Sequence, residues 1–415
     1  MTSIVVLGGA GGVGRMAVET LLHVDEVDEV VVTDLRADAA TAVVEELADP
    51  RLRAASVDVV DTDAVAALIT GADVVLSCVG PFYRFGPPAL EAAIRAGVRY
   101  VDVCDDLDAT RALLALDGAA RDAGVQALIG MGNSPGIANV FVKLCAEQFL
   151  DTVTSADIMH IHGGEPSEGA AVLKHRVHAM VNDVPLFVDG AFVDVRMLEP
   201  SGQAFIRTED FPGLGPYPVY PYPHPETITL PAAFPSLRRA TNLGVVFPLS
   251  YFELTQDLVR AGLGGDEPLR VGDTEVAPID VLVAVLQRDR PRLLAEADVA
   301  GRAGCLRVEV TGERDGAEHT YVCTLSSTSA GAGEGTGIPA AIGAALHARG
   351  ALGGGPGVHP PEAVVPVDDF LALATGVIGR LGLSGGKADG APAELPLTVE
   401  HLGPDGAREV MVGAR

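Results

Sequence analysis

Apolar and polar positions follow two different patterns along the chain, and the first pattern covers roughly the first third of the chain. Short runs rich in Val and Ile, typical of strands buried on both faces of a parallel sheet, alternate with stretches rich in Ala and Leu that have helical character. The strand candidates are 3–8, 29–34, 54–58, 73–79, 99–104 and 125–130. The helix candidates are 15–22, 37–48, 62–69, 87–96 and 108–123. This alternation predicts an α/β fold, with a doubly wound, Rossmann-type parallel sheet over residues 1–131.

After Gly136 the pattern becomes that of antiparallel hairpins. The apolar runs 186–188 and 192–195 flank the turn dipeptide Asp189-Gly190, and an alternating run at 306–311 precedes Asp315-Gly316. These patterns predict a second, α+β domain with an antiparallel sheet over residues 132–335. The segment 212–225, rich in Pro and aromatic residues, has no period and predicts a long ordered loop.

The last part of the chain begins with the helical stretch 338–348. Because this stretch follows the second domain closely, we expect the helices of residues 336–380 to return and pack on the first domain. Residues 381–415 are predicted to be a linker, flexible around 383–394, and a C-terminal tail or added strand.

Composition narrows the class of partner. The chain has 415 residues, 48% of them hydrophobic, and a net charge of −27, so it would repel nucleic acid and an anionic membrane surface. The uncharged stretch 125–142 is interrupted by Gly, Pro and Asn and does not predict a membrane span. The five widely spaced cysteines indicate free thiols in a reducing compartment, and residues 1–3 lead straight into an apolar run with no signal-peptide pattern. We therefore expect a cytoplasmic protein.

The strongest motif is a glycine-rich loop after the first strand. Its G-x-G-x-x-G pattern uses Gly9 for a tight turn, Gly11 for close approach of a pyrophosphate, and Gly14 for packing of helix on strand. The intervening residues Gly12 and Val13 belong to the same cofactor-binding loop.

An acidic residue in the expected place accompanies this loop. Asp34 ends the second strand 20 residues after Gly14, which suits hydrogen bonds to the adenosine ribose of NAD. Arg36 could instead reach the 2′-phosphate of NADP, so NAD is the favoured cofactor and NADP the alternative.

Three further motifs carry a family resemblance. The segments 75–82, 96–103 and 132–136, in this order and spacing, resemble the saccharopine dehydrogenase superfamily, and segments 234–239 and 358–362 are most similar to its L-lysine 6-dehydrogenase branch. The resemblance implies NAD(P)-dependent hydride transfer at a carbon–nitrogen bond, by oxidative deamination of an amine or amino acid or by reduction of an imine. It also implies a homodimer or higher homo-oligomer.

The resemblance further assigns residues to the site. It places Val79, Gly80, Pro81 and Phe82 along the nicotinamide half of the cofactor, and it implies a substrate-binding turn where cofactor and substrate meet. That turn consists of Asn133, Ser134, Pro135 and Gly136. Residues 172–178 and 224–227 depart from the lysine 6-dehydrogenase pattern where the substrate is expected to bind. We therefore expect a small amine or amino acid, with lysine itself in question.

Catalytic candidates lie mainly on a helix over residues 172–182. Lys174, His175, His178 and Asn182 share its polar face, and His175 is the favoured general base, with His178 as a second candidate. Arg176 falls on the apolar face and is expected to pair with a carboxylate, either of the substrate or of a residue such as Asp102. The alternative is that this polar face is only solvated surface.

Two acidic residues complete the candidate site. Asp102 ends a parallel strand, where open α/β sheets bind ligands, and its negative charge would suit a cationic amine. Glu226 is a further substrate-binding candidate.

A zinc site formed by His160, His162, His175 and His178 is disfavoured, and no metal is expected. The alternatives for the whole protein are an enoyl reductase that acts on a C=C bond and a non-catalytic dinucleotide-binding protein.

Overall fold

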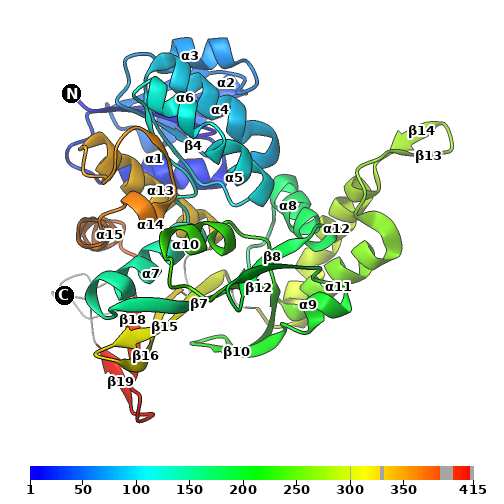
Figure 1. The fold of residues 1–415 in the computed structure, drawn as a ribbon. Coiled ribbons are helices and arrows are strands. Elements are labelled where there is room, and N and C mark those ends of the chain that lie inside the picture. Colours follow the sequence, from blue (N-terminus) through cyan, green and yellow to red (C-terminus); the bar gives the residue numbers. More distant parts are fainter. Residues whose placement is uncertain (300, 328–330, 384–395, 412–415) are drawn as a thin grey trace. The chain divides into compact units, whose positions relative to one another are not determined.

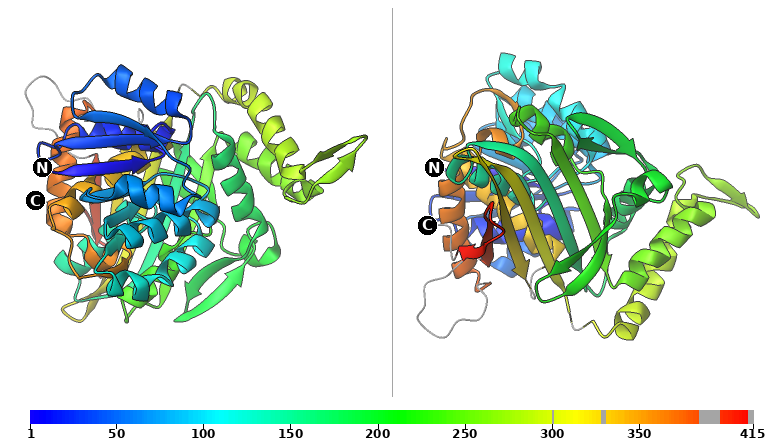
Figure 2. Two further views of the ribbon diagram at one scale, coloured as in Figure 1. Left: turned by 90° about the horizontal axis from the view of Figure 1, so that it is seen from above. Right: turned by 60° about the horizontal axis from the view of Figure 1, so that its bottom comes forward.

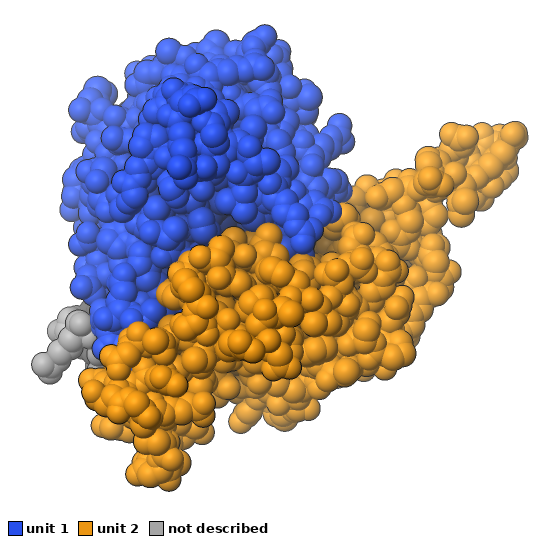
Figure 3. Space-filling model, viewed as in Figure 1, with its two compact units in different colours: residues 1–149, 332–397, 415 blue, residues 150–331, 398–414 orange. Residues whose placement is uncertain are grey.

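The structure is a computed structural model that describes residues 1–299, 301–327, 331–383 and 396–411 (Figure 1). The chain forms two compact units, coloured separately in Figure 3. Unit 1 comprises residues 1–149 and 332–397, and unit 2 comprises residues 150–331 and 398–414. The sequence predicted a boundary near residue 132, whereas unit 1 continues through helix α7 (Ile137–Gln148), whose residues are largely buried.

Unit 1 contains a parallel sheet of seven strands in the order β17-β6-β5-β4-β1-β2-β3. Its strands are β1 (Ser3–Leu7), β2 (Glu29–Asp34), β3 (Leu52–Ser56), β4 (Val74–Ser77), β5 (Arg99–Asp102), β6 (Gln126–Leu128) and β17 (Gly357–His359). Its helices, besides α7, are α1 (Gly12–Leu21), α2 (Ala37–Leu47), α3 (Thr62–Ile69), α4 (Phe82–Ala96), α5 (Leu107–Leu114), α6 (Asp117–Asp122), α13 (Ala332–Ala348), α14 (Pro361–Val364) and α15 (Val367–Arg380). The predicted Rossmann-type fold class is confirmed.

Two packing contacts shape the part of unit 1 that carries the glycine-rich loop. Strand β1 is buried from Ile4 to Leu7 between β2 and β4, as the apolar run requires. Helix α13 packs against α1, and a Cβ at Gly337 would lie only 2.6 Å from the carbonyl oxygen of Val13. The start of α1 is therefore held between the sheet and a helix from the far end of the chain.

Unit 2 is built on a sheet of ten strands. These strands are β7 (Thr152–Gly163), β8 (Val184–Val188), β9 (Ala191–Val195), β10 (Arg207–Phe211), β11 (Gly215–Pro221), β12 (Arg239–Phe247), β15 (Ala303–Arg314), β16 (Ala317–Ser327), β18 (Leu397–Leu402) and β19 (Arg408–Met411). A separate hairpin consists of β13 (Leu269–Val271) and β14 (Thr274–Val276). The helices are α8 (Ala170–Val181), α9 (Pro200–Gln203), α10 (Glu226–Ala233), α11 (Leu249–Leu258), the π-helical turn η1 (Val259–Leu263) and α12 (Pro278–Glu296).

The ten-stranded sheet is mixed. Most neighbouring strands are antiparallel, and the hairpins predicted at Asp189-Gly190 and Asp315-Gly316 are confirmed as β8–β9 and β15–β16. Strands β12 and β7, however, run parallel from the pair Arg239 and Ser155 onward. This parallel pair, which no local turn connects, brings residues from two distant segments side by side at the centre of the sheet.

Two local predictions have different outcomes. The segment 212–225 is not one long loop, because half of it forms β11, which pairs with β10. The C-terminal part contains the hairpin β18–β19, next to β16, and so adds strands to the sheet of unit 2. Most of the predicted linker, residues 384–395, lies outside the described residues.

Candidate functional site

The glycine-rich loop closes tightly between β1 and α1. The Gly9 N–H donates to the carbonyl of Thr33 at 2.7 Å, and a Cβ on Gly14 would lie 2.8 Å from the carbonyl carbon of Gly8. Gly14 is therefore required by the protein's own packing. In contrast, a Cβ on Gly11 would make only an ordinary contact, and one on Gly12 would meet nothing within 4 Å.

This open space lies where a helix begins. Gly11 is the N-cap of α1, and no side chain caps the first turn, so the N–H groups of Gly12 and Val13 are left to a ligand or solvent. Such a helix end, approached by a backbone without side chains, suits a pyrophosphate. The loop fits a nicotinamide dinucleotide on this local geometry.

The predicted ribose and nicotinamide segments follow strands that neighbour β1. Asp34 ends β2, and its Oδ1 accepts a hydrogen bond from the backbone N–H of Arg36 at 3.0 Å, while the Arg36 side chain is exposed. Val79 follows β4, and its Cγ2 would lie 2.9 Å from a Cβ on Gly8. Because β1 lies between β2 and β4, all three segments emerge at the same edge of the sheet.

The other predicted nicotinamide residues form the entry to α4. Pro81 is the N-cap of this helix, Gly80 precedes it, and Phe82 opens the helix with 6% of its surface exposed. Gly80 has open space where a Cβ would lie. Phe82 contributes mainly to packing, so Gly80 and Pro81 are the better candidates for contact with a cofactor.

Asp102, predicted to be a catalytic residue facing a cationic substrate, is fully buried in the structure. Its Oδ1 accepts hydrogen bonds from the backbone N–H groups of Gly130 at 2.7 Å and Cys104 at 3.0 Å. Burial raises the pKa of Asp102 to about 6, although these backbone bonds favour the carboxylate. Asp102 thus joins the segments that follow β5 and β6, and its catalytic role stays a prediction.

The four residues of the turn predicted to bind substrate differ in how deeply they are buried. The Gly136 N–H donates to Asn139 Oδ1 at 2.8 Å, and the backbone of Gly136 has a φ of 122°, so Gly136 and its buried neighbour Pro135 shape the turn. Asn133 and Ser134 are partly exposed. These two residues are the ones whose side chains remain candidates for substrate contact.

Arg176 is buried in an ion-pair network inside unit 2. Its two terminal nitrogens donate to Glu168 at 3.1 and 2.6 Å, and Arg290 Nη1 and the Tyr251 hydroxyl donate to the same carboxylate at 2.9 and 2.8 Å. Burial favours protonation of Glu168, but the two guanidinium charges outweigh it and hold the pKa of Glu168 at about 2. Arg176 therefore pairs with a carboxylate of the protein, and that carboxylate belongs to Glu168 and not to Asp102. A role of Arg176 in substrate binding stays a prediction.

A set of aromatic rings, here called the histidine cluster, lies inside the same unit and comprises His160, His175, Tyr222 and His224. The rings of His160 and His224 stack at a centroid distance of 5.2 Å and an interplanar angle of 7°. Tyr222 meets both rings edge-on at 5.5 and 5.2 Å. The ring of His175 lies 6.4 Å from Tyr222 and 6.5 Å from His224.

The histidine cluster favours neutral imidazoles. Burial lowers the pKa of His160 to about 3, and burial together with the neighbouring His160 and His175 lowers the pKa of His224 well below its usual value. Burial also lowers the pKa of His162, which lies on the same face of β7 as His160. Near neutral pH, His160 and His224 therefore add no positive charge to this part of unit 2.

Glu226 lies next to the histidine cluster. Its side chain is fully buried at the start of α10, where Asn242 Nδ2 donates to Glu226 Oε1 at 3.3 Å and His224 Nδ1 lies 3.9 Å from Oε2. Asn242 Oδ1 in turn lies 3.0 Å from His160 Nε2. Glu226 is thus linked to His160 through Asn242, and its predicted contact with substrate stays a prediction.

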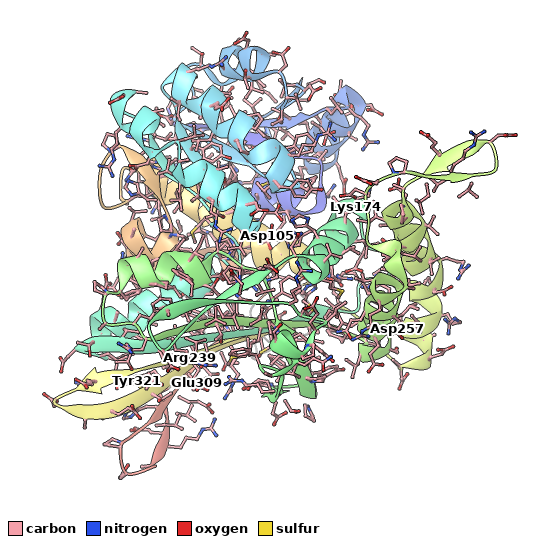
Figure 4. The ribbon with its side chains drawn as sticks, turned by 45° about the vertical axis from the view of Figure 1, so that its right-hand side comes forward. Asp105, Lys174, Arg239, Asp257, Glu309 and Tyr321 are labelled. Atoms are coloured by element: carbon pink, nitrogen blue, oxygen red, sulfur yellow. The ribbon has the colours of Figure 1, made fainter. Side chains whose placement is uncertain are left out.

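The other polar residues of α8 have separate contacts. Lys174, labelled in Figure 4, lies with Nζ 2.7 Å from Asp280 Oδ1 on α12. His178 is half-buried one turn after Lys174, and its carbonyl accepts the Asn182 side chain at 2.9 Å. Among the polar residues predicted to share this helix face, His175 is the one that the structure brings into the histidine cluster.

Sequence reasoning did not single out Tyr222 and Asn242. Tyr222 lies within the Pro-rich segment interpreted as a loop, and Asn242 lies within a strand of otherwise largely apolar residues. The signal available was Asn242 itself, because a polar residue inside a buried strand needs a partner. That partner, His160, lies 82 positions away in the sequence.

No helix within the described part of the chain is both long and apolar enough to cross a membrane.

The open glycine-rich loop at the edge of a parallel sheet defines a nicotinamide dinucleotide-binding fold, and comparison with known proteins agrees with this class. Residues 4–128 match the family described as the saccharopine dehydrogenase NADP binding domain. This match confirms the superfamily resemblance predicted from the sequence motifs.

Two curated relatives match most of the chain. Carboxyaminopropylagmatine dehydrogenase of Synechocystis sp. is 24% identical over 401 residues, which cover 91% of this chain and 96% of that protein. Carboxynorspermidine synthase of Vibrio cholerae is 26% identical over 343 residues, covering 74% and 77% respectively. The narrower similarity to L-lysine 6-dehydrogenase stays a prediction.

One solved structure shares the fold over most of its length. Apo histidine-tagged saccharopine dehydrogenase (L-Glu forming) from Saccharomyces cerevisiae has a TM-score of 0.64 at 16% identity, covering 92% of this chain and 98% of that one. At this identity the likeness concerns the fold alone. The chain is thus similar to a saccharopine dehydrogenase NADP binding domain over residues 4–128, and to the two relatives named above over most of its length.

Proposed function

We propose that the protein catalyses hydride transfer at a carbon–nitrogen bond, most simply the reduction of an imine formed between a small amine and a carbonyl compound, or the reverse oxidation of the resulting amine. The observation that carries this proposal is the histidine cluster, in which the half-buried imidazole of His175 lies near the buried, neutral ring of His224. The names of both relatives describe carboxylated polyamine-like compounds with C–N bonds.

The cofactor proposal rests on unit 1. Bound NAD(P) supplies or accepts the hydride. The backbone of Gly11 and Gly12 holds the pyrophosphate, and the carboxylate of Asp34 accepts hydrogen bonds from the ribose hydroxyls and repels a 2′-phosphate. We therefore favour NAD, with NADP as the alternative that Arg36 would serve.

The proton chemistry rests on unit 2. His175 takes the proton from the amine nitrogen in the oxidative direction and returns it in the reductive direction. An imidazole suits this role because it can both accept and donate a proton near neutral pH. The neutral rings of His160 and His224 do not repel a cationic amine as protonated rings would. Asn133 and Ser134 are proposed to contact the substrate, with Lys174 and His178 as weaker candidates.

The test is a screen of small amines, each alone with NAD(P)⁺ and each combined with a carbonyl-bearing acid and NAD(P)H, followed by absorbance of the reduced cofactor. With an active pair in hand, His175→Ala should lower turnover by roughly 10²–10⁴-fold and leave cofactor affinity nearly unchanged. His319→Ala, which removes a histidine on β16 outside the histidine cluster, is the matched control and should keep full turnover.

Two results would contradict the proposal. Cofactor binding without turnover on any amine would favour a non-catalytic dinucleotide-binding protein. Equal turnover in the His175 and His319 variants would remove His175 from the mechanism.

A further inference from the structure

Strand β12 carries two residues that meet the ring of His160. Strands β12 and β7 are parallel neighbours in the sheet of unit 2, which Figure 2 shows from two further directions. In this register Gly244 lies directly beside His160, and Asn242 lies two residues earlier on the same face of β12. Both positions are buried, so contacts inside unit 2 decide which side chains can occupy them.

Gly244 leaves the space that the His160 ring occupies. A Cβ at position 244 would overlap Cε1 of the ring and would lie 2.6 Å from Nε2 and 2.9 Å from Nδ1. Gly244 has no positive φ, so its backbone conformation does not require glycine. Glycine inside a strand weakens the strand and often marks a site of close approach. The group that approaches here is the imidazole of His160.

Asn242 fixes the edge of the same ring. Its Nδ2 donates to Glu226 Oε1 at 3.3 Å, so its Oδ1 is turned toward His160 Nε2, at 3.0 Å. An amide oxygen only accepts hydrogen bonds, so Nε2 carries the proton of the neutral imidazole. An amide also lacks the charge of a carboxylate, and it therefore holds the ring without strongly favouring protonation.

The backbone of Asn242 holds a second part of the histidine cluster. Its carbonyl accepts the N–H of Tyr222 at 2.9 Å, and the carbonyl of Tyr222 accepts the N–H of His224 at 3.0 Å. The rings of Tyr222 and His224 both lie against His160, edge-on at 5.5 Å and stacked at 5.2 Å. The three rings therefore share a support on β12, and a displacement of His160 changes the packing of the other two.

His175 meets this support through Tyr222 and His224. Its ring lies 6.4 Å from that of Tyr222 and 6.5 Å from that of His224. His175 belongs to α8, outside the strand pair, so its surroundings depend on where these two rings are held. A misplacement of about 1 Å in a catalytic constellation can cost roughly 10²-fold in rate.

We propose that Gly244 and Asn242 are positioning residues of the site: they hold His160 along β12 and, through the rings of Tyr222 and His224, set the surroundings of His175. The proposal rests on the proposed function, since it assumes that His175 exchanges a proton with the substrate. Both residues act through other side chains, so neither is a catalytic residue.

The test compares Gly244→Ala with Gly304→Ala in the full-length protein. Gly304 lies on β15 beside His162, and a Cβ there would make only ordinary contacts, the nearest 3.4 Å from the carbonyl oxygen of Ile161. With a productive amine, Gly244→Ala should lower turnover roughly tenfold or more, because the His160 ring has to move by about 1 Å to clear the new methyl group. Gly304→Ala should keep full turnover. Both variants should bind the cofactor like the unsubstituted chain, because the glycine-rich loop belongs to unit 1.

NMR of the histidine rings tests the positioning without turnover. In protein labelled with ¹⁵N-histidine, the signals of His160 and His224 are identified by their loss in His160→Ala and His224→Ala. Burial lowers the pKa of His160 to about 3 and that of His224 well below its usual value, so both rings should stay neutral down to about pH 5, with the proton of His160 on Nε2. In Gly244→Ala at least one of the two rings should become protonated above about pH 5, because a displaced ring admits water.

A stability cycle shows whether the ring of His160 is what position 244 accommodates. Gly244→Ala should lower the urea midpoint of the chain that carries His160, and it should not lower the midpoint in the His160→Ala background, where no ring is in the way. Asn242→Ala should change the titration of His160 or His224 as Gly244→Ala does, because the His160 ring loses its hydrogen bond at Nε2.

Three outcomes would overturn the proposal. Equal turnover in Gly244→Ala and Gly304→Ala would remove Gly244 from the positioning of the site while leaving the C–N chemistry intact. Unchanged titration of His160 and His224 in both Gly244→Ala and Asn242→Ala would show that β12 does not hold the rings. A proton on Nδ1 of His160 in the unsubstituted chain would contradict the contact with Asn242.

Failure of the proposed function would give a different result. No amine would then be turned over by the unsubstituted chain, while the NMR changes would still follow Gly244→Ala. That result would contradict the C–N chemistry and would still support the packing of the rings on β12.

Discussion

Alanine at three neighbouring glycines should separate the cofactor's requirement for space from that of the fold. At Gly14 the added Cβ would lie 2.8 Å from the carbonyl carbon of Gly8 and 2.9 Å from Cα of Gly9. These are backbone atoms that cannot rotate away, so we expect Gly14→Ala to cost about 1–3 kcal/mol of unfolding free energy through overpacking. At Gly12 the Cβ meets nothing within 4 Å, and Ala in the first turn of α1 should stabilise the helix by up to about 1 kcal/mol.

Gly11→Ala is the informative variant of the three. Its Cβ would lie 3.4 Å from the Gly8 carbonyl oxygen, an ordinary contact, so the variant should fold with near-normal stability. It should nevertheless bind NAD⁺ and NADP⁺ at least tenfold more weakly, because the Cβ occupies the space through which a pyrophosphate approaches. Urea denaturation and cofactor fluorescence titration measure the two effects separately. Unchanged cofactor affinity in Gly11→Ala would refute the assignment of this loop.

Three further predictions concern charged residues. The carboxylate of Glu168 stabilises the fold above pH 4.5, and about 3 kcal/mol of unfolding free energy should be lost as the pH falls toward 2. In urea denaturation, Glu168→Gln should abolish this pH-dependent loss. The same variant should be less stable at pH 7, because Arg176 and Arg290 lose their shared carboxylate. The raised pKa of Asp102 means that its contribution to stability falls as the pH rises from about 4 to 6, so Asp102→Asn should flatten the stability profile in that window, and a profile that kept its slope would contradict the burial argument. Asp34→Asn should narrow the preference for NAD⁺ over NADP⁺ in parallel titrations, whereas an unchanged ratio would show that Asp34 does not select the cofactor.

The sequence predicted best those features that short segments determine. The glycine-rich loop and Asp34 could be located because the motif, the strand before it and the acidic residue after it lie within one βαβ unit. The hairpins at Asp189-Gly190 and Asp315-Gly316 were equally accessible, because the turn dipeptides and the flanking alternation are local.

Features that depend on distant contacts were missed or misassigned. Strand β11 was hidden by Pro216 and Pro218, which lack N–H groups and are tolerated here because this end of β11 pairs only with β10. The partner of Arg176 could not be chosen from the sequence, because Glu168 is shared with Arg290 from another helix. The histidine cluster likewise depends on the parallel pairing of β7 with β12, which no local pattern specifies.

Isotope transfer tests the central claim most directly. The reduced cofactor carrying deuterium at the transferred position would be incubated with the protein, a productive amine and a carbonyl-bearing acid, and the product analysed by mass spectrometry with fragmentation. Hydride transfer at a carbon–nitrogen bond predicts one deuterium on the carbon that becomes bonded to the amine nitrogen. Deuterium on a carbon without a bond to nitrogen, as reduction of a C=C bond would give, would contradict the proposed function.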